Sequence, residues 1–253
     1  MISTYLSAAF TITLFFTLKR LIIMMHFRIT LVGVSLLSLG SYILAGQGDG
    51  LKKHELYWTY NDVRESLENW ASAFNEPSGK LIRGYVAQKE YKSILDIPCG
   101  GCPEYFGYRN ENTAIDYVGM DITQRLVDFA LEKGINAKQG SIEAIPCSDK
   151  SFDVCYARHI FEHLAYYEKA LDELIRVAKH EVIAIFFIMP ENASDDIVCT
   201  SEKSSLLYNN RYDKRGIEEY IKKNDRVESF SWEILKKTTP YGDEGILHIY
   251  LRE

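Results

Sequence analysis

The sequence predicts an α/β fold: an open, mostly parallel sheet with helices on both faces and an antiparallel hairpin at the C-terminus. Strand patterns near residues 93–97, 117–121, 135–139, 152–156 and 181–188 alternate with helical patterns such as 124–133 and 166–179. This alternation is typical of parallel βαβ units. Residues 181–189 are almost wholly apolar, as expected of a central strand covered on both faces.

The two ends of this region carry different patterns. Strand patterns at residues 226–235 and 245–251 are separated by residues 238–243, which predicts the closing hairpin. Before the first strand, apolar and aromatic residues between 57 and 74 recur at helical spacing, and residues 78–91 indicate a second helix.

The turn after the first strand is the most informative segment. Asp96 lies at the end of that strand and is followed by a turn that contains Gly100 and Gly101. Amides at a glycine turn, together with the N-terminus of the next helix, bind anionic groups. A carboxylate at the tip of the next parallel strand, about 20 residues further on, is where a nucleotide ribose is held. Asp121 occupies that place.

This arrangement resembles the class I (Rossmann-like) S-adenosylmethionine-dependent methyltransferases, and more narrowly the small type 11 methyltransferase domains. Residues 140–146, 151–164 and 174–179 are similar to the third-strand, fourth-strand and following-helix segments of that family, in the same order. The resemblance covers residues 85–253, about two thirds of the chain. In the family's first motif an acid precedes glycines at alternate positions; here those places hold Asp96, Pro98, Gly100 and Cys102, so two of the three glycines are replaced.

The resemblance implies that S-adenosylmethionine is the cosubstrate and that Rossmann-like strand tips bind it. It implies a contact from Asp96 to the amino group and ribose binding by Asp121. Ser141 departs from the acid that often meets adenine in the family, so the backbone of Ser141 and Ile142 is expected there. The full set of expected cosubstrate contacts is Asp96, Pro98, Gly100, Gly101, Asp121, Ile122, Ser141, Ile142 and Arg158.

His159 is the candidate catalytic residue, because it follows the fourth strand where the methyl sulfonium would lie. His159 and His163 are four residues apart, which predicts one helical face. With Glu162 they form a string that also occurs in some zinc peptidases. Since no further glutamate ligand is identifiable, we expect no metal site and expect His163 to pack against its neighbours.

Two other functions are compatible with the sequence. Cys99 and Cys102 form a Cys-x-x-Cys motif at a predicted helix N-terminus, as in thioredoxin-like thiol oxidoreductases. Asp121 and the strand at 152–156 have no place in that fold. The replaced glycines are compatible with a domain that binds S-adenosylmethionine without catalysis.

Charge and composition bear on the acceptor. The formal net charge is −6, which argues against nucleic acid as a partner. The resemblance implies direct methyl transfer to an oxygen or nitrogen of the acceptor. Residues 189–192 and the insertion at 194–215 are expected to contact the acceptor, and the polar and aromatic residues of the insertion favour a small polar molecule.

The N-terminus predicts a membrane segment. Residues 1–18 and 29–45 contain no charged side chain, and each run is at the lower edge of the length that spans a bilayer. A cleaved signal peptide and an incorrect start site are the alternatives. We therefore divide the chain into an anchor or signal segment at 1–45, a linker at 46–56 and a methyltransferase domain at 57–253. Although flanking cations favour export, the cytosolic cosubstrate favours a cytosolic domain.

Overall fold

The computed structural model describes residues 53–60, 64–202, 205–240 and 242–253. The predicted anchor or signal at 1–45 and most of the predicted linker lie outside these residues, so these interpretations remain predictions. None of the helices within the described ranges combines the length and the hydropathy of a bilayer-spanning segment.

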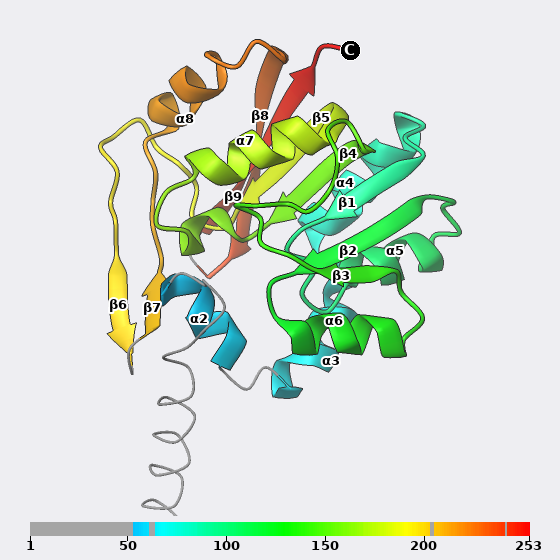
Figure 1. The fold of residues 1–253 in the computed structure, drawn as a ribbon. Coiled ribbons are helices and arrows are strands. Elements are labelled where there is room, and N and C mark those ends of the chain that lie inside the picture. The colour runs from blue at the N-terminus through cyan, green and yellow to red at the C-terminus, as the bar shows by residue number, and fades with distance from the viewer. Residues whose placement is uncertain (1–52, 61–63, 203–204, 241) are drawn as a thin grey trace, which may run out of the picture. The chain divides into compact units, whose positions relative to one another are not determined.

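A seven-stranded sheet with the order β3-β2-β1-β4-β5-β9-β8 forms the centre of the domain (Figure 1). Strands β1 to β5 are parallel, and β9 and β8 are antiparallel to their neighbours. This confirms the predicted open, mostly parallel sheet with a C-terminal hairpin. The strands are β1 (Ser93–Asp96), β2 (Asp116–Asp121), β3 (Ala137–Gln139), β4 (Phe152–Arg158), β5 (Ala178–Phe186), β8 (Val227–Thr239) and β9 (Gly242–Leu251).

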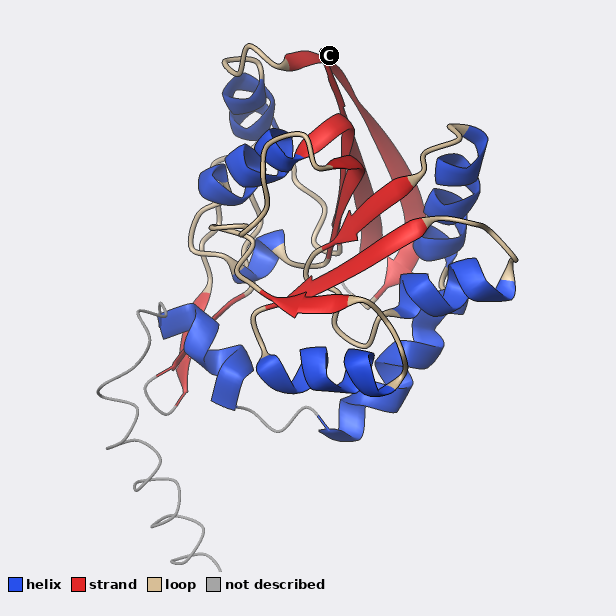
Figure 2. Ribbon diagram, turned by 45° about the vertical axis from the view of Figure 1, so that its right-hand side comes forward, coloured by secondary structure: helices blue, strands red, loops and turns tan. Residues whose placement is uncertain are grey.

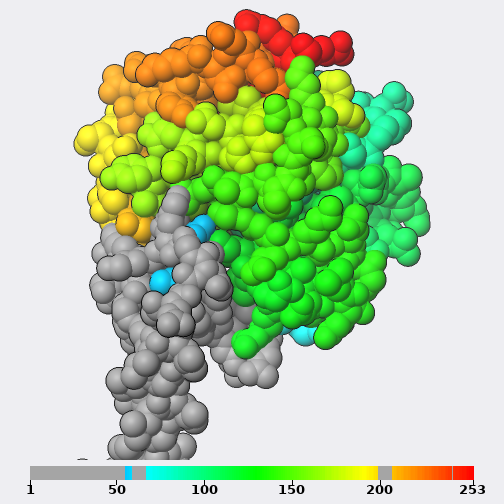
Figure 3. All heavy atoms as spheres, viewed as in Figure 1, coloured from blue at the N-terminus to red at the C-terminus, as the bar shows by residue number. Residues whose placement is uncertain are grey.

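Helices cover both faces of the sheet (Figure 2). Side chains of α4 (Pro77–Gln88), α5 (Pro103–Asn110) and α6 (Gln124–Glu132) belong to one apolar cluster. Side chains of α7 (Glu168–Val177) and α8 (Lys214–Ile221) belong to another. In the space-filling view, the residues of α8 and β8 (orange) lie at the same end of the molecule as the C-terminus (Figure 3).

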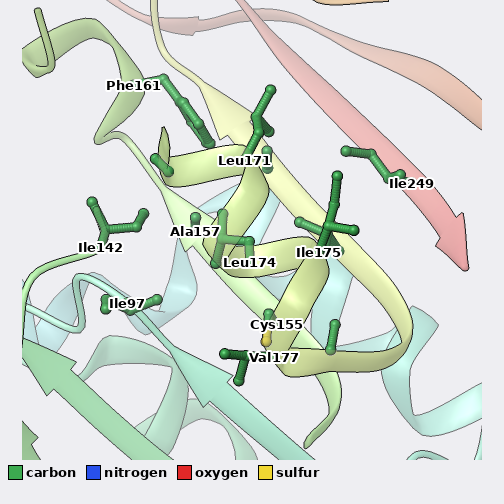
Figure 4. Close-up of a cluster of buried hydrophobic side chains, with 14 of the residues drawn as sticks. Ile97, Ile142, Cys155, Ala157, Phe161, Leu171, Leu174, Ile175, Val177 and Ile249 are labelled. Atoms are coloured by element: carbon green, nitrogen blue, oxygen red, sulfur yellow. The ribbon is translucent and has the colours of Figure 1, made fainter. Parts of the chain in front are cut away.

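Strand β4 shows why the sheet separates two cores. Its side chains alternate: Val154 and Tyr156 pack with α4 to α6, whereas Cys155 and Ala157 pack with α7. Figure 4 shows Cys155 and Ala157 among the side chains of α7. Successive residues of a strand point to opposite faces, so a strand covered on both faces must be apolar throughout.

Several boundaries differ from the predicted ones. The helix expected between 57 and 74 is two helices, α2 (Lys53–Tyr60) and α3 (Arg64–Ser72), followed by a 3₁₀ turn, η2 (Ala73–Asn75). Helical periodicity continues across the break, so it does not reveal the break. Helix α7 ends at Val177, where β5 begins, because residue 178 already pairs with Phe152 of β4.

The insertion at 194–215 also contains regular structure. It forms a separate two-stranded sheet of β6 (Cys199–Glu202) and β7 (Ser205–Tyr208), which lies beside α2 (Figure 1). Buried side chains fasten the following segment: Asn210 Nδ2 and Tyr212 Oη both donate to the Leu164 carbonyl oxygen, each at 2.7 Å.

Candidate functional site

A cavity of about 510 Å³ opens at the carboxyl ends of the central strands. Asp96 ends β1 opposite Tyr156 of β4, and Asp121 ends the neighbouring strand β2. The strand order reverses between β1 and β4, which is where open α/β sheets bind ligands. The volume lies within the range of about 300–1,000 Å³ that small-molecule sites occupy.

Residues from several separate segments line the cavity. Trp58 and Trp70 come from α2 and α3, and the turn at 98–101 follows β1. The segments 121–123, 158–160 and 238–240 come from the ends of β2, β4 and β8. Of the expected cosubstrate contacts, Asp96, Pro98, Gly100, Gly101, Asp121, Ile122 and Arg158 line this cavity, together with His159.

The turn after β1 contains two residues with a left-handed backbone. Gly100 and Cys102 both adopt left-handed conformations, with φ of 52° and 55°. The Cys102 side chain is fully buried in the apolar cluster of α4 to α6 and does not line the cavity. A Cβ atom at Gly101 would lie 2.7 Å from the backbone nitrogen of Ala71. Gly101 is therefore needed for the close approach of α3.

Asp121 is buried and holds two backbone amides. Its Oδ2 accepts a hydrogen bond from Gly100 N at 3.1 Å, and its Oδ1 accepts one from Thr123 N at 2.9 Å. Burial raises the pKa of Asp121 to about 6, although these amides favour the charged form. Because a carboxylate oxygen has two lone pairs, each oxygen can accept one more hydrogen bond. The residue thus joins the glycine turn to the tip of β2 and faces the cavity.

Within the part of the chain that the structure describes, Asp96 has no cationic partner at hydrogen-bond distance. The Tyr117 hydroxyl donates to Asp96 Oδ2 at 2.6 Å. Burial raises the pKa of Asp96 well above its usual value, and this hydrogen bond only partly opposes the shift. A positively charged ligand group beside Asp96 would favour its ionised form. The site therefore fits an ammonium group.

Arg158 belongs to a buried network at the end of β4. Its Nη2 donates to Glu76, and its Nη1 lies 3.5 Å from Glu104 Oε1. Glu104 also accepts hydrogen bonds from Arg83 Nη1 at 2.7 Å and from the Tyr156 hydroxyl at 3.1 Å. The Nε of Arg158 is buried without a hydrogen-bond partner among the described residues. Arg158 therefore retains a donor for an anionic group.

Ser141 and Ile142 are not among the residues that line the cavity, so their expected contact with adenine remains a prediction. Ser141 Oγ donates to Glu55 Oε1 of α2 at 2.7 Å, and Ile142 packs in the apolar core. Helix α2 instead places Trp58 in the cavity wall, where the Trp58 carbonyl oxygen accepts from Thr123 Oγ1 at 3.2 Å. The sequence around Ser141, after β3, gives no indication that α2 contacts this loop.

His159 and His163 do not share a helical face, so that prediction is wrong. His159 has a left-handed backbone, with φ of 56°, and His163 ends a 3₁₀ turn, η3 (Phe161–His163). Both rings contact Phe187, with centroid distances of 5.4 and 5.3 Å. Among the described residues no group of three or more His, Cys, Asp or Glu side chains is arranged to hold a metal ion.

Each histidine has one nitrogen committed to a hydrogen bond. His159 Nε2 lies 2.6 Å from Glu244 Oε1, and His163 Nδ1 lies 2.7 Å from the Tyr208 carbonyl oxygen. A carbonyl oxygen only accepts, so His163 carries its proton on Nδ1 when neutral. Burial lowers the pKa of both histidines.

Comparison with known proteins agrees with this geometry. Residues 95–186 match the family model described as a methyltransferase domain. The YcgJ methyltransferase of Bacillus subtilis is 29% identical over 133 residues, which cover 50% of this chain and 51% of that protein. A tRNA (carboxymethyluridine(34)-5-O)-methyltransferase of Mus musculus is 25% identical over 141 residues, covering 54% of this chain and 20% of that protein. The PH0226 protein of Pyrococcus horikoshii OT3 shares the fold, with a TM-score of 0.54, 19% identity, and coverage of 80% of this chain and 100% of that chain.

Residues 95–186 match a methyltransferase domain. The resemblance drawn from the sequence is thereby confirmed, and S-adenosylmethionine is the cosubstrate that the family implies. The chain spans about half the length of the first curated relative it matches.

The cysteines of the methyltransferase domain do not form a reactive thiol pair. Cys99 and Cys102 are free and buried. The hydrogen bond with Cys102, together with burial, raises the pKa of Cys99 well above its usual value. Thiol exchange requires an exposed thiolate. The described part of the chain therefore has neither the fold nor the reactive thiol that the thioredoxin-like alternative requires.

We expect iodoacetamide to label Cys99 and Cys102 of the native protein at least about tenfold more slowly than the half-buried Cys147, because thiolate formation and access both limit alkylation. Peptide mass spectrometry after timed labelling measures this. Labelling in urea, where all thiols are accessible, is the control. Equal native rates at the three cysteines would contradict the burial of the motif.

Four residues at or beside the candidate site escaped the sequence analysis. Glu104 and Arg83 lie within helices whose pattern gave no sign of a buried ion pair. Trp58 and Glu244 approach the site from α2 and β9, far from the glycine turn in sequence. A charged residue at the start of an apolar strand is the one signal that could have pointed to Glu244.

Proposed function

We propose that the protein transfers a methyl group from S-adenosylmethionine to an oxygen or nitrogen atom of a small acceptor. One observation carries the proposal: Asp96, Asp121 and Arg158 line a single cavity at the switch point of a class I methyltransferase sheet. The activity is inferred for a chain that spans only part of its relatives.

The residues in the cavity wall fit the donor part by part. Asp121 has lone pairs for ribose hydroxyls, and Asp96 is a buried carboxyl that an ammonium would stabilise. Arg158 has a buried Nε–H for the carboxylate of the methionine moiety. Ile122 and Leu126 supply apolar surface where a nucleobase is to be held.

When bound, S-adenosylmethionine supplies a methyl group already activated by its sulfonium. The protein then contributes by positioning the methyl donor and the acceptor and by excluding water. These two effects account for large rate increases without a covalent intermediate. Trp58 and Phe187 line the cavity as apolar walls, and His159 lies at its edge on the β4 side. We assign His159 to the acceptor end of the site.

A small acceptor fits the charge of the chain better than nucleic acid does. The formal net charge is −6, and phosphate backbones are bound by excess Lys and Arg. Arg158 is the cationic side chain that lines the cavity within the described residues, and it is paired with Glu76 and Glu104. The acceptor is therefore expected to be uncharged or weakly charged where it meets the cavity.

Replacing Asp121 by Ala is expected to weaken binding of S-adenosylhomocysteine by about 1.5–3 kcal/mol, or roughly 10- to 150-fold, because a charged hydrogen-bond partner is lost. Isothermal titration calorimetry on the full chain measures the change. Asp116→Ala is the matched control, since Asp116 lies exposed at the other end of the same strand.

Circular dichroism on each variant shows whether it is folded at the temperature of the titration. A folded Asp121→Ala variant with unchanged affinity would remove Asp121 from the site. Absence of binding by the wild-type chain would contradict the proposed function itself. Binding without any methyl transfer to any acceptor class would favour the non-catalytic alternative.

A further inference from the structure

A histidine–carboxylate pair lies at the cavity, with a partly exposed His159 and a buried Glu244. His159 Nε2 and Glu244 Oε1 are 2.6 Å apart, and Glu244 Oε1 also accepts from Ser78 Oγ at 3.1 Å. Glu244 is 1% exposed and lies on β9, whereas His159 follows β4 and lines the cavity. The C-terminal hairpin thus places the Glu244 carboxylate beside His159, the histidine that the sequence indicates as catalytic.

We propose that His159 is the general base of the reaction, that Glu244 is its positioning residue, and that the acceptor presents a hydroxyl group on an aromatic or apolar body. This inference rests on the proposed function and names its substrate class.

The hydrogen bond fixes which nitrogen of His159 is available. Although burial opposes ionisation, the hydrogen bond with His159 lowers the pKa of Glu244, so Glu244 is a carboxylate that accepts. His159 then carries its proton on Nε2 and has a lone pair on Nδ1. Nδ1 has no hydrogen-bond partner among the described residues. The left-handed backbone of His159 is uncommon for a non-glycine residue, and such conformations cluster at active sites.

Burial, and not the surrounding charges, favours the neutral imidazole of His159, which can accept a proton. Glu244 of β9 and Glu76 before α4 favour the charged form, whereas Arg158 of β4 and the neighbouring His163 of η3 oppose it. Burial is the largest influence and lowers the pKa of His159. A neutral base beside a carboxylate can take up a proton without leaving an unpaired buried charge.

The proton balance of methyl transfer explains why such a pair favours a hydroxyl acceptor. The acceptor oxygen forms a bond to the methyl carbon while the carbon–sulfur bond breaks and its electron pair goes to sulfur. The hydroxyl proton passes to His159 Nδ1, and the positive charge moves from sulfonium to imidazolium, where Glu244 stabilises it. A neutral amine needs no base in this step, because its product is a stable ammonium.

The walls near His159 indicate the body of the acceptor. Phe187, Trp58 and His163 form a chain of ring contacts, with centroid distances of 5.3 Å between His163 and Phe187 and 5.0 Å between Trp58 and His163. Ile160 and Pro240 line the same cavity. Aromatic rings stack favourably on such walls. A phenol combines a flat apolar body with the hydroxyl that His159 would deprotonate.

The test compares two probes that share a ring: 4-methylphenol and 4-methylbenzylamine. Full-length protein is incubated with S-adenosylmethionine and each probe, and S-adenosylhomocysteine formation is quantified by mass spectrometry. We expect at least about tenfold faster transfer to the phenol. His159→Gln should slow that transfer by about 10²-fold, the size of effect typical of general base catalysis.

Glu244→Gln tests the positioning role through the pH profile. The rate should rise with pH as His159 loses its proton, and removal of the carboxylate should move this rise to lower pH because the imidazolium is no longer stabilised. A change in packing alone would not move the profile. Glu181→Gln is the matched control: Glu181 is also buried and lies 2.7 Å from a histidine, His248, but does not line the cavity.

The outcomes separate this inference from the proposed function. Calorimetry with S-adenosylhomocysteine is run on the same preparations. Suppose that the wild type binds S-adenosylhomocysteine. The proposed acceptor class and base are then wrong if the wild type does not methylate 4-methylphenol, if it prefers the amine, or if His159→Gln matches its rate and pH profile. In each of these cases the methyltransferase proposal stands. If the wild type does not bind S-adenosylhomocysteine, the proposed function fails first.

Discussion

Replacing Arg83 by Met is expected to lower the free energy of unfolding by about 3–5 kcal/mol, the cost of breaking a buried ion pair from one side. Arg83 Nη1 lies 2.7 Å from Glu104 Oε2, with side-chain exposures of 0% and 2%. Its Nη2 also donates to Glu111 Oε1 at 2.8 Å and to the Phe74 carbonyl oxygen at 2.6 Å. Methionine fills similar volume but leaves the buried Glu104 carboxylate without this partner.

Urea unfolding followed by circular dichroism measures the change. Lys236→Met is the matched control, because Lys236 and Asp243 are also 2.7 Å apart but have side-chain exposures of 74% and 30%. Exposed pairs contribute about 0–1 kcal/mol. Similar small losses in both variants would show that water reaches the Arg83 pair.

The Arg83 pair also connects stability to the site. Glu104 contacts Arg158 on its other oxygen, and Arg158 lines the cavity. A Cβ atom at Gly107 of α5 would lie 2.3 Å from the Arg83 guanidinium. Position 107 therefore requires glycine for α5 to pack against the Arg83 side chain. The buried network therefore sets the distance between α4, α5 and the end of β4.

Local patterns were sufficient for the parallel strands and for the residues at their tips. Asp96 and Asp121 follow apolar runs, and their distance from the glycine turn is a property of the chain alone. Because parallel strands end at one edge of the sheet, these residues meet wherever the sheet forms. The predicted residues Pro98, Gly100, Gly101, Ile122 and Arg158 line the cavity for the same reason.

Contacts between distant segments could not be predicted. Glu244 meets His159 only because β9 pairs with β5 in an antiparallel register, with Phe186 opposite Gly245. Ser141 turns to Glu55 because α2 crosses that loop. The left-handed backbone of His159 replaces the expected helical face, and no spacing rule shows such a change. Single-sequence patterns report periodicity along one segment, whereas these contacts depend on how two segments pack.

We expect a second large effect, on the pH dependence of stability, at Glu162, the residue before His163 in η3. Glu162 is 0% exposed, and its Oε1 accepts from Ile188 N at 3.0 Å. Its Oε2 is buried with no hydrogen-bond partner among the described residues. Burial raises the pKa of Glu162 to about 8, despite the backbone amides that favour its charged form. We therefore expect the native protein to hold Glu162 protonated at neutral pH.

The sign of the pH dependence follows from proton linkage. Between the usual glutamate value of about 4.3 and about 8, the unfolded chain has lost this proton and the native state has kept it. Stability falls with rising pH wherever the native state binds more protons. Over this window Glu162 alone should reduce the free energy of unfolding by about 3 kcal/mol between pH 5 and pH 8.

Glu162→Gln should remove this loss, because glutamine keeps the shape of the protonated acid and does not ionise. We expect urea unfolding at pH 5 and pH 8 to show a pH-dependent loss about 3 kcal/mol smaller in the variant than in the wild type. Asp96 and Asp121 also have raised pKa values, but both remain in the variant and cancel in the comparison. Glu219→Gln, at an exposed glutamate of α8, is the control and should behave as the wild type does. An equal loss of stability in Glu162→Gln and wild type would mean that Glu162 is already ionised in the native protein, with water or a cation reaching Oε2.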